Sequence, residues 1–459
     1  MTILNTPLPQ LALALRSGKI TITQIIEASL ASYTASEHQL NAYKTWAGTN
    51  ALEVAQHLDS LIKQGYDFGP LMGIPISVKD MFAVPNLPTF AGSALDLGSA
   101  WQQPGKLIQA LLHQAAIITG KTHTVEFALG GLGVNNHWGT PQNPWSKDQA
   151  RVPGGSSAGA GVSLCQGSAL LALGTDTAGS VRIPAAMTGT VGLKTTVGRW
   201  PTDQIVPLST SLDTPGVLAK NVTDLAYGYA AIESQLSGQE VKIPSLASCK
   251  GLRIGLVENF FWEGANNAVT QEVRRAASQL EAAGAELISL QVPMCDEVFA
   301  CFQAGGLSVA ELAAFLTNNL PTSYAKLDPV VRTRLEDGAA ISVSEYLQRK
   351  DLLAQASLVA AQTFEQVDVW LHPTLPITAP SMAEIEQLED YRRLNMIALR
   401  NPSIANLMGL CALSLPVGVD EQGLPIAMQL TAGAQQEVKL LALAQVIEQQ
   451  LGYFSDLTN

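Results

Sequence analysis

The chain has few charged residues and few aromatic ones. Only 14% of its 459 residues are charged and 6% are aromatic, whereas 47% are hydrophobic. This excludes the low-hydrophobicity, high-charge composition of a disordered chain. Lys plus Arg number 27 against 39 Asp plus Glu, a net charge of −12. A chain of that charge is poorly suited to bind a polyanion, so we expect no direct nucleic-acid partner.

Cysteines are also scarce and show no pairing pattern. The five are odd in number, scattered and without a C-x-x-C pair, which argues against a disulfide framework or a zinc ribbon; they are Cys165, Cys249, Cys295, Cys301 and Cys411. No basic segment followed by an apolar run marks a secretory signal at the N-terminus. The longest uncharged stretch, 153–175, is rich in Gly and Ser and is unsuited to span a bilayer. We therefore expect a cytoplasmic protein with no membrane partner.

Alternating helix and strand patterns predict an α/β protein. Apolar residues at three- and four-residue spacing predict helices at 21–32 and 51–62, separated by a break at Ser36. The segments 252–257, 268–282 and 285–290 read as one strand–helix–strand unit. Further strands are expected at 74–80, 116–121, 368–374 and 411–417, and further helices at 107–115 and 437–450.

No repeat, charge block or linker divides the chain, so we predict a single domain over residues 1–459. It begins with a helical segment at about 8–65. A core that carries the functional motifs follows at about 70–200, and residues 201–459 complete the same domain.

A run of Gly and Ser at 153–161 needs a chemical explanation. A phosphate-binding loop is improbable because Val162, not Lys, follows Gly161. Gly155 to Gly159 formally fits the G-x-S-x-G nucleophile elbow with Ser157, yet no buried strand precedes it. In a third interpretation, the segment 174–180 lets backbone N–H groups converge on one oxygen, and Ser180 attacks. Its base would then be a lysine kept neutral by burial, such as Lys79 in its apolar segment.

Motifs along nearly the whole chain resemble those of the amidase signature family. The lysine segment is Pro70-Leu-Met-Gly-Ile-Pro-Ile-Ser-Val-Lys-Asp, and the serine-glycine segment is Gly154-Gly-Ser-Ser-Ala-Gly-Ala-Gly. The nucleophile segment is Gly174-Thr-Asp-Thr-Ala-Gly-Ser-Val-Arg-Ile-Pro-Ala. Pro88-Thr-Phe-Ala-Gly-Ser, Gly192-Leu-Lys-Thr, His372-Pro-Thr-Leu-Pro and Gly423-Leu-Pro-Ile-Ala-Met-Gln match as well. All these motifs in this order are highly specific.

The resemblance implies a mixed, mostly parallel sheet wrapped by helices and an amide hydrolase that works through an acyl-enzyme. Lys79 would be the base, Ser156 a bridging serine after a cis peptide bond, and Ser180 the nucleophile. The oxyanion hole would consist of the backbone N–H groups of Thr177, Ala178, Gly179 and Ser180. No metal or organic cofactor is implied. Ala158 and Ala178 depart from the family pattern, since many members have glycine there.

The substrate is less well defined by the sequence. The glycine-rich segment 126–138 resembles a loop beside the family's substrate pocket, and Phe82, Phe127, Leu129 and Leu132 would form an apolar wall that favours an aryl or apolar acyl group. An amide or carbamate of a small molecule is expected. Primary amides, anilides and esters stay open, as does a homodimer. His123 and Glu126 are spaced to share a metal, but a core or surface pair is the more ordinary interpretation.

Two alternative functions remain. One is the glutaminase A subunit of a tRNA-dependent amidotransferase, which works with partner chains. Against it, the run Thr122-His-Thr-Val-Glu-Phe differs from the Asn-Met-Asp-Glu-Phe associated with that subunit. The other is a serine hydrolase with a histidine base, for which His372 is the candidate. Asp176, Arg182 and Ser157 are expected to fix the catalytic loops by hydrogen bonds.

Overall fold

The computed structural model describes residues 3–321 and 324–454. At its centre lies an 11-stranded sheet with the order β1-β3-β2-β4-β6-β5-β10-β11-β9-β7-β8. The strands are β1 (Tyr43–Trp46), β2 (Pro75–Lys79), β3 (Ile117–Thr122), β4 (Leu171–Asp176), β5 (Val191–Lys194), β6 (Thr214–Ala219), β7 (Arg253–Val257), β8 (Glu286–Leu290), β9 (Val369–Pro373), β10 (Cys411–Val419) and β11 (Pro425–Ala432). This confirms the predicted single α/β domain.

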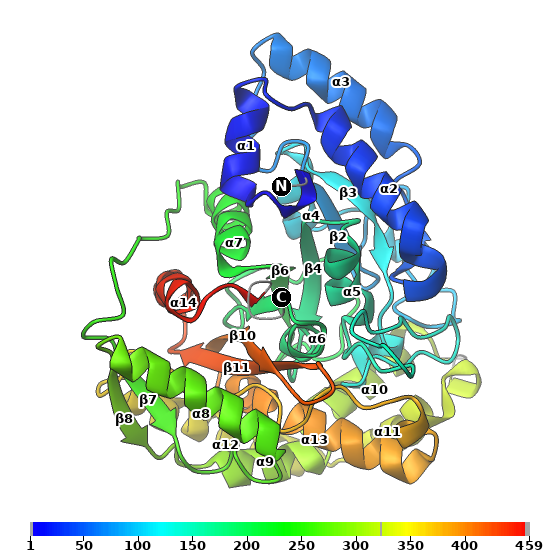
Figure 1. Cartoon of the computed structure of the whole chain (residues 1–459). Helices are drawn as coiled ribbons and strands as arrows, with labels where there is room; N and C mark the ends of the chain where they lie inside the picture. The colour runs from blue at the N-terminus through cyan, green and yellow to red at the C-terminus, as the bar shows by residue number, and fades with distance from the viewer. Residues whose placement is uncertain (1–2, 322–323, 455–459) are drawn as a thin grey trace.

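Helices surround the sheet, with α1 to α3 at one end of the molecule and α8, α9, α12 and α13 at the other (Figure 1). The helices are α1 (Leu8–Arg16), α2 (Ile22–Leu40), α3 (Ala51–Lys63), α4 (Lys106–Leu112), α5 (Ala158–Gln166), α6 (Arg182–Thr188), α7 (Val222–Ser237), α8 (Asn267–Ala282), α9 (Cys295–Gln303), α10 (Ser308–Asn319), α11 (Pro329–Ala339), α12 (Val343–Thr363), α13 (Leu388–Leu407) and α14 (Glu437–Leu451).

Strand pairing is mixed. The parallel pairs form two groups, β3-β2-β4 and β9-β7-β8. Between them, β4 to β9 are joined by antiparallel pairs. We expected mostly parallel pairing, but the βαβ patterns in the sequence occur only in the two outer groups. The short connection between β10 and β11 makes that central pair an antiparallel hairpin.

Local sequence explains most of the elements. Thr21 and Gln24 form a reciprocal capping box at the start of α2. That helix continues through Ser36 to Leu40, so the predicted break is wrong. Tyr33 and Leu40, on either side of the serine, pack against a small apolar cluster and support the last turns of the helix. The helix α8 buries Val269, Val273 and Leu280, which share one face.

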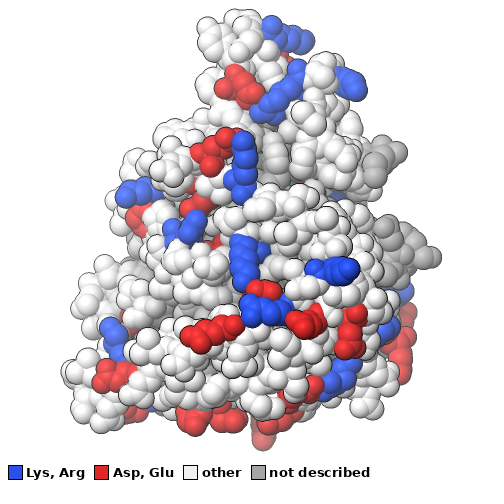
Figure 2. All heavy atoms as spheres, turned by 90° about the vertical axis from the view of Figure 1, so that its left-hand side faces the viewer, with Lys and Arg blue, Asp and Glu red and all other residues white. Residues whose placement is uncertain are grey.

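The stretch Cys295–Asn319 is long and apolar enough to cross a membrane by length and composition, with a mean hydropathy of 1.5. This is weak evidence, because core helices pass the same test. In the structure the stretch divides into α9 and α10, and half of its most apolar 18-residue window is buried. On the face shown in Figure 2, the described basic and acidic side chains are interspersed rather than gathered by sign.

Candidate active site

The predicted catalytic residues meet at one edge of the parallel strands β2 and β4. These strands are neighbours, with Val78 opposite Leu173, so their carboxyl ends lie at the same edge. Lys79 is the last residue of β2. Ser156 precedes the helix α5, and Ser180 follows β4 and precedes the helix α6. Two strand ends and two loops therefore bring together residues that are 101 positions apart at most.

Lys79 and Ser156 are in direct contact. The Nζ atom of Lys79 lies 2.7 Å from Ser156 Oγ, 2.7 Å from Thr175 Oγ1 and 3.4 Å from the Thr175 carbonyl oxygen. Both Lys79 and Ser156 have no exposed surface. The contact that the resemblance implied between base and bridging serine is thus present, and Thr175 is an additional partner that the sequence did not single out.

The environment of Lys79 favours a neutral amine. Burial lowers the pKa of Lys79 to about 7, against the opposing fields of the Asp213 and Asp176 carboxylates. A neutral amine has two N–H groups and one lone pair. Thr175 offers two acceptors to the N–H groups, which leaves the lone pair for the hydroxyl of Ser156. This arrangement suits a general base.

The two serines lie on neighbouring loops. The peptide bond before Ser156 is cis, as the resemblance implied. The N–H of Ser157 donates to the Ser180 carbonyl over 3.2 Å and ties the two loops together. Ser157 itself is fully buried, and its hydroxyl donates to the Thr175 carbonyl over 3.3 Å. Ser180, by contrast, lines a small cavity.

The segment 177–180 forms one wall of this cavity. Thr177, Ala178 and Ser180 line it, and the N–H groups of Ala178 and Ser180 meet no acceptor among the described residues. The N–H of Gly179 instead donates to Asp176 Oδ1 over 2.7 Å. We therefore revise the expected oxyanion hole: Gly179 is held by the carboxylate, and the other three residues face the cavity.

Asp176 anchors this loop from behind. Its carboxylate accepts from Gly179 and from the N–H of Val181, and it pairs with the guanidinium of Arg182 at 3.0 Å. Burial alone would raise the pKa of Asp176, but the charge of Arg182 holds it well below the usual range. Asn406 also donates to the carboxylate over 2.9 Å. These contacts agree with the structural part expected for Asp176 and Arg182.

Asp213 is a second carboxylate beside Lys79, and no motif in the sequence pointed to it. It lies just before β6, accepts from the hydroxyl of Thr177, and accepts from the N–H groups of Leu208 and Ser209 over 2.9 and 3.0 Å. Burial raises the pKa of Asp213 to about 6. Because Asp213 has no ion-pair partner within 4.0 Å among the described residues, its charge acts on Lys79 without a competing cation.

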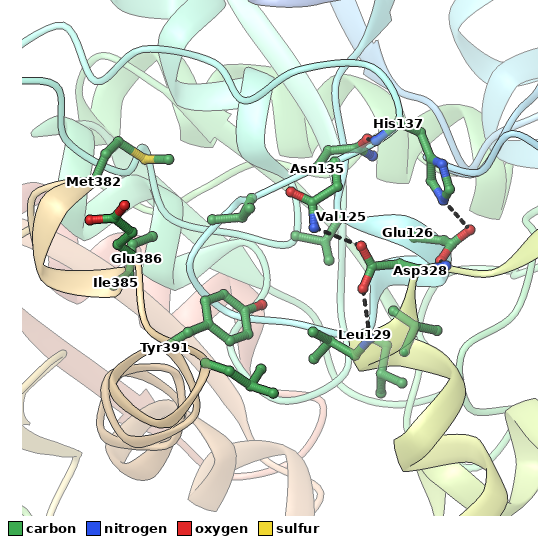
Figure 3. A pocket seen from close by; sticks show the side chains of 15 residues that line it. Val125, Glu126, Leu129, Asn135, His137, Asp328, Met382, Ile385, Glu386 and Tyr391 are labelled. Carbon is green, nitrogen blue, oxygen red and sulfur yellow. Dashed lines mark hydrogen bonds and ion pairs between the residues drawn. The ribbon is translucent and has the colours of Figure 1, made fainter.

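Two hollows adjoin the catalytic loops. The cavity at Ser180 has a volume of about 20 Å³, close to that of one water molecule. A larger pocket of about 360 Å³ lies beside it and shares Leu129 as a wall. Figure 3 shows this pocket, with the His137–Glu126 pair on one side and Glu386 and Met382 on the other.

The structure places the four predicted pocket residues differently. Leu129 lines both hollows. Phe82, Phe127 and Leu132 have no exposed surface and pack in the apolar core clusters. These three do not line either hollow among the described residues, because their side chains pack into the core instead.

The remaining candidates have other partners. His372 is buried against the ring of Phe261; its nitrogens contact the Pro373 carbonyl (2.9 Å) and Gln429 (3.3 Å). Burial lowers the pKa of His372 to about 3. None of these contacts reaches a catalytic serine, so the structure does not support His372 as the base.

The predicted spacing of His123 and Glu126 does not bring them to one point. His123 Nε2 contacts Asn41 Oδ1 at 3.3 Å, whereas Glu126 Oε1 accepts from Ser93 and contacts His137 at 2.9 Å.

Comparison with known proteins gives consistent relatives. The Amidase family model matches residues 24–441. A 2-amino-5-chloromuconic acid deaminase from Comamonas testosteroni is 49% identical over 98% of this chain and 97% of its own length. An amidase from Pseudomonas putida is 34% identical over 91% of this chain and 90% of its own. The crystal structure of an amidase superposes with a TM-score of 0.87 at 29% identity, covering 97% of this chain and 100% of that one.

The family match covers the strands, the helices and the loops that carry Lys79, Ser156 and Ser180. The fold and the order of the motifs agree with it. The chain is therefore a hydrolase that belongs to the amidase signature family.

Proposed function

We propose that this enzyme hydrolyses a carbon–nitrogen bond in a small-molecule amide, with Ser180 as nucleophile, Ser156 as proton bridge and Lys79 as base. The observation that carries the proposal is the 2.7 Å contact between the fully buried Lys79 and Ser156, whose loop is hydrogen-bonded to the loop of Ser180. A buried lysine with a pKa near 7 is half neutral at neutral pH and can accept a proton there.

In the first half-reaction, Ser180 Oγ attacks the amide carbon while its proton passes to Ser156 and the proton of Ser156 passes to Lys79. The negative charge on the carbonyl oxygen develops beside the free N–H groups of Ala178 and Ser180. The protons then return through Ser156 to the nitrogen, the C–N bond breaks, and ammonia or an amine leaves. Ser180 keeps the acyl group as an ester.

In the second half-reaction, water attacks this ester and gives its proton to the same relay. The ester bond breaks, the carboxylic acid leaves, and the hydroxyl of Ser180 is restored. One amide and one water thus give one acid and one ammonia or amine. These steps draw only on water and on the side chains of this chain, so the proposed reaction needs no cofactor.

A second candidate function is deamination of an amino-substituted carboxylic acid. It is favoured by the 49% identity with the 2-amino-5-chloromuconic acid deaminase over nearly the full length of both chains. Hydrolytic deamination would consume one water: Lys79 would accept a proton from the water, the C–N bond would break, ammonia would leave, and the carbon would keep the oxygen of the water as a carbonyl group. The glutaminase alternative predicts instead that glutamine is the preferred substrate and that partner chains co-purify.

One experiment distinguishes these functions. The purified enzyme is assayed for ammonia release from primary amides, carbamates, glutamine and 2-amino-5-chloromuconic acid, and is then labelled with a fluorophosphonate. We expect the label on Ser180 and expect Ser180→Ala to abolish both labelling and turnover. The matched variant Ser157→Ala should still be labelled. Label on Ser157, or full activity of Ser180→Ala, would refute the proposed nucleophile.

A further inference from the structure

The helix α12 has an apolar stripe on the side that faces solvent. Val343 is 76% exposed, Leu347 54% and Leu358 70%, and Ala354 is exposed between the two leucines. At about 100° per residue around a helix, these four side chains lie within about 60° of one another. One exposed leucine is ordinary on a protein surface, whereas a row of apolar residues along one helix indicates an interaction surface.

The opposite side of α12 holds the helix in place. The buried residues on that side are Arg349, Leu353, Ala356, Ala360 and Thr363. The helix contacts α9 and α13 in the part of the molecule that lies lowest in Figure 1. A surface helix ordinarily carries polar residues on its solvent side. The packing of this chain alone therefore does not explain the apolar stripe.

Two opposite charges flank the middle of the stripe. Lys350 and Asp351 are both exposed, and neither has an ion-pair partner within 4.0 Å among the described residues. The Nζ atom of Lys350 lies 6.0 Å from the centre of the Tyr346 ring. At helical spacing, Lys350 lies on one edge of the stripe and Asp351 on the other, at nearly the same height along the helix. The surface thus has an apolar centre and one charge of each sign at its two edges.

This pattern is complementary to itself in one orientation. When two such helices pack in parallel about a two-fold axis, each edge of one stripe meets the opposite edge of the other. Lys350 of each copy then meets Asp351 of the other copy, and each apolar residue meets its own counterpart. In an antiparallel pair, equal edges meet, so lysine would face lysine and aspartate would face aspartate. The charges therefore favour the parallel pair.

We propose that this chain forms a homodimer in which the exposed sides of two parallel α12 helices pack against each other. The helix has 21 residues and is about 30 Å long, so the helix pair is a small interface. We expect a reversible dimer with a dissociation constant in the micromolar range. This surface is separate from the catalytic site, so its test does not depend on the role of Ser180.

Sedimentation equilibrium of the full chain between about 1 and 100 µM tests the dimer. The mass of the wild type should rise with concentration from 48.6 kDa toward twice that value. Leu347→Asp and Leu358→Asp each place a charge in the apolar centre of both copies, so each should weaken dimerisation at least about 100-fold. The matched control is Leu13→Asp on α1, a leucine that is 69% exposed at the other end of the molecule. It should leave the dissociation constant within about twofold of wild type.

Charge reversal tests the parallel orientation. Lys350→Glu places two acids opposite each other at both edges, so it should weaken dimerisation about tenfold, and Asp351→Lys should do the same with two bases. The two changes combined exchange the signs of both ion pairs and should restore the dissociation constant to within about threefold of wild type.

Disulfide cross-linking measures the same orientation. In a parallel pair, Leu347→Cys and Leu358→Cys each face their own counterpart, so mild oxidation should join the two copies in both variants. In an antiparallel pair, at most one of these two positions can lie on the two-fold axis. The wild type, with its five native cysteines, and Leu13→Cys are the controls and should stay unlinked.

A wild type that stays monomeric up to about 100 µM would overturn the proposal. A dimer that persists in Leu347→Asp and Leu358→Asp, or one that Leu13→Asp dissociates, would overturn it as well, since the interface would then lie elsewhere. Lack of rescue by the combined charge reversal would refute the parallel pair. Circular dichroism of each variant shows whether it is folded. If a leucine variant unfolds, Lys350→Glu and its rescue still decide the question, because both charged residues are exposed.

Discussion

Replacing Lys79 by methionine should abolish activity and yet stabilise the protein at neutral pH. Burial lowers the pKa of Lys79 from 10.5 to about 7, so the folded state binds its proton less readily than the unfolded state does. The folding free energy lost in this way is close to zero above about pH 10.5, and it increases as the pH falls to about 7. At 1.36 kcal/mol per pKa unit, the penalty is about 4 kcal/mol at pH 7 and about 1 kcal/mol at pH 10.

The lost contacts act in the opposite direction. Methionine removes the hydrogen bonds of Lys79 to Ser156 and Thr175, worth about 1 kcal/mol each. The net expectation for Lys79→Met is a gain of about 2 kcal/mol at pH 7 and a loss of about 1 kcal/mol at pH 10. For a chain of this length, these values correspond to shifts of about +2 °C and −1 °C in Tm. Calorimetry at both pH values measures them.

Lys121 provides the matched control, because it is equally buried but paired. Its Nζ lies 3.0 Å from Asp80 Oδ1, and neither side chain is more than 1% exposed. Lys121→Met leaves the Asp80 carboxylate buried without its partner, so we expect a loss of about 3–5 kcal/mol at pH 7. A Tm difference between wild type and Lys79→Met that is the same at pH 7 and pH 10 would refute a neutral Lys79.

Three further outcomes are expected. The rate constant kcat/KM should rise as the pH increases through about 7, because Lys79 loses its proton there. Asp213→Asn should move this rise to lower pH, since it removes a charge that stabilises the ammonium form of Lys79. An unchanged pH profile in this variant would contradict that influence of Asp213. Arg182→Met should lose about 3–5 kcal/mol in thermal unfolding because Asp176 stays buried and charged; an unchanged Tm would count against that anchor. His372→Ala should retain activity within about tenfold, and its inactivation would revive the histidine alternative.

The sequence predicted the elements well where one strand or helix face carries the signal. The strand–helix–strand unit from β7 to β8 and the closing helix α14 lie within two residues of the predicted bounds. The break at Ser36 failed, because a single serine on a helix surface costs little once the opposite face is packed. The antiparallel centre of the sheet also escaped prediction, since pairing partners distant in sequence leave no periodic trace.

The sequence by itself determined the family and predicted Lys79, Ser156 and Ser180 as the catalytic residues, because those motifs are contiguous and specific. Only the tertiary structure decided what surrounds them. The lowered pKa of Lys79 depends on complete burial by distant segments, and the Asp213 carboxylate acts on Lys79 only because β6, which follows Asp213, pairs with β4 beside β2. Charge, burial and distance between remote residues are properties of the folded chain, and no local pattern encodes them.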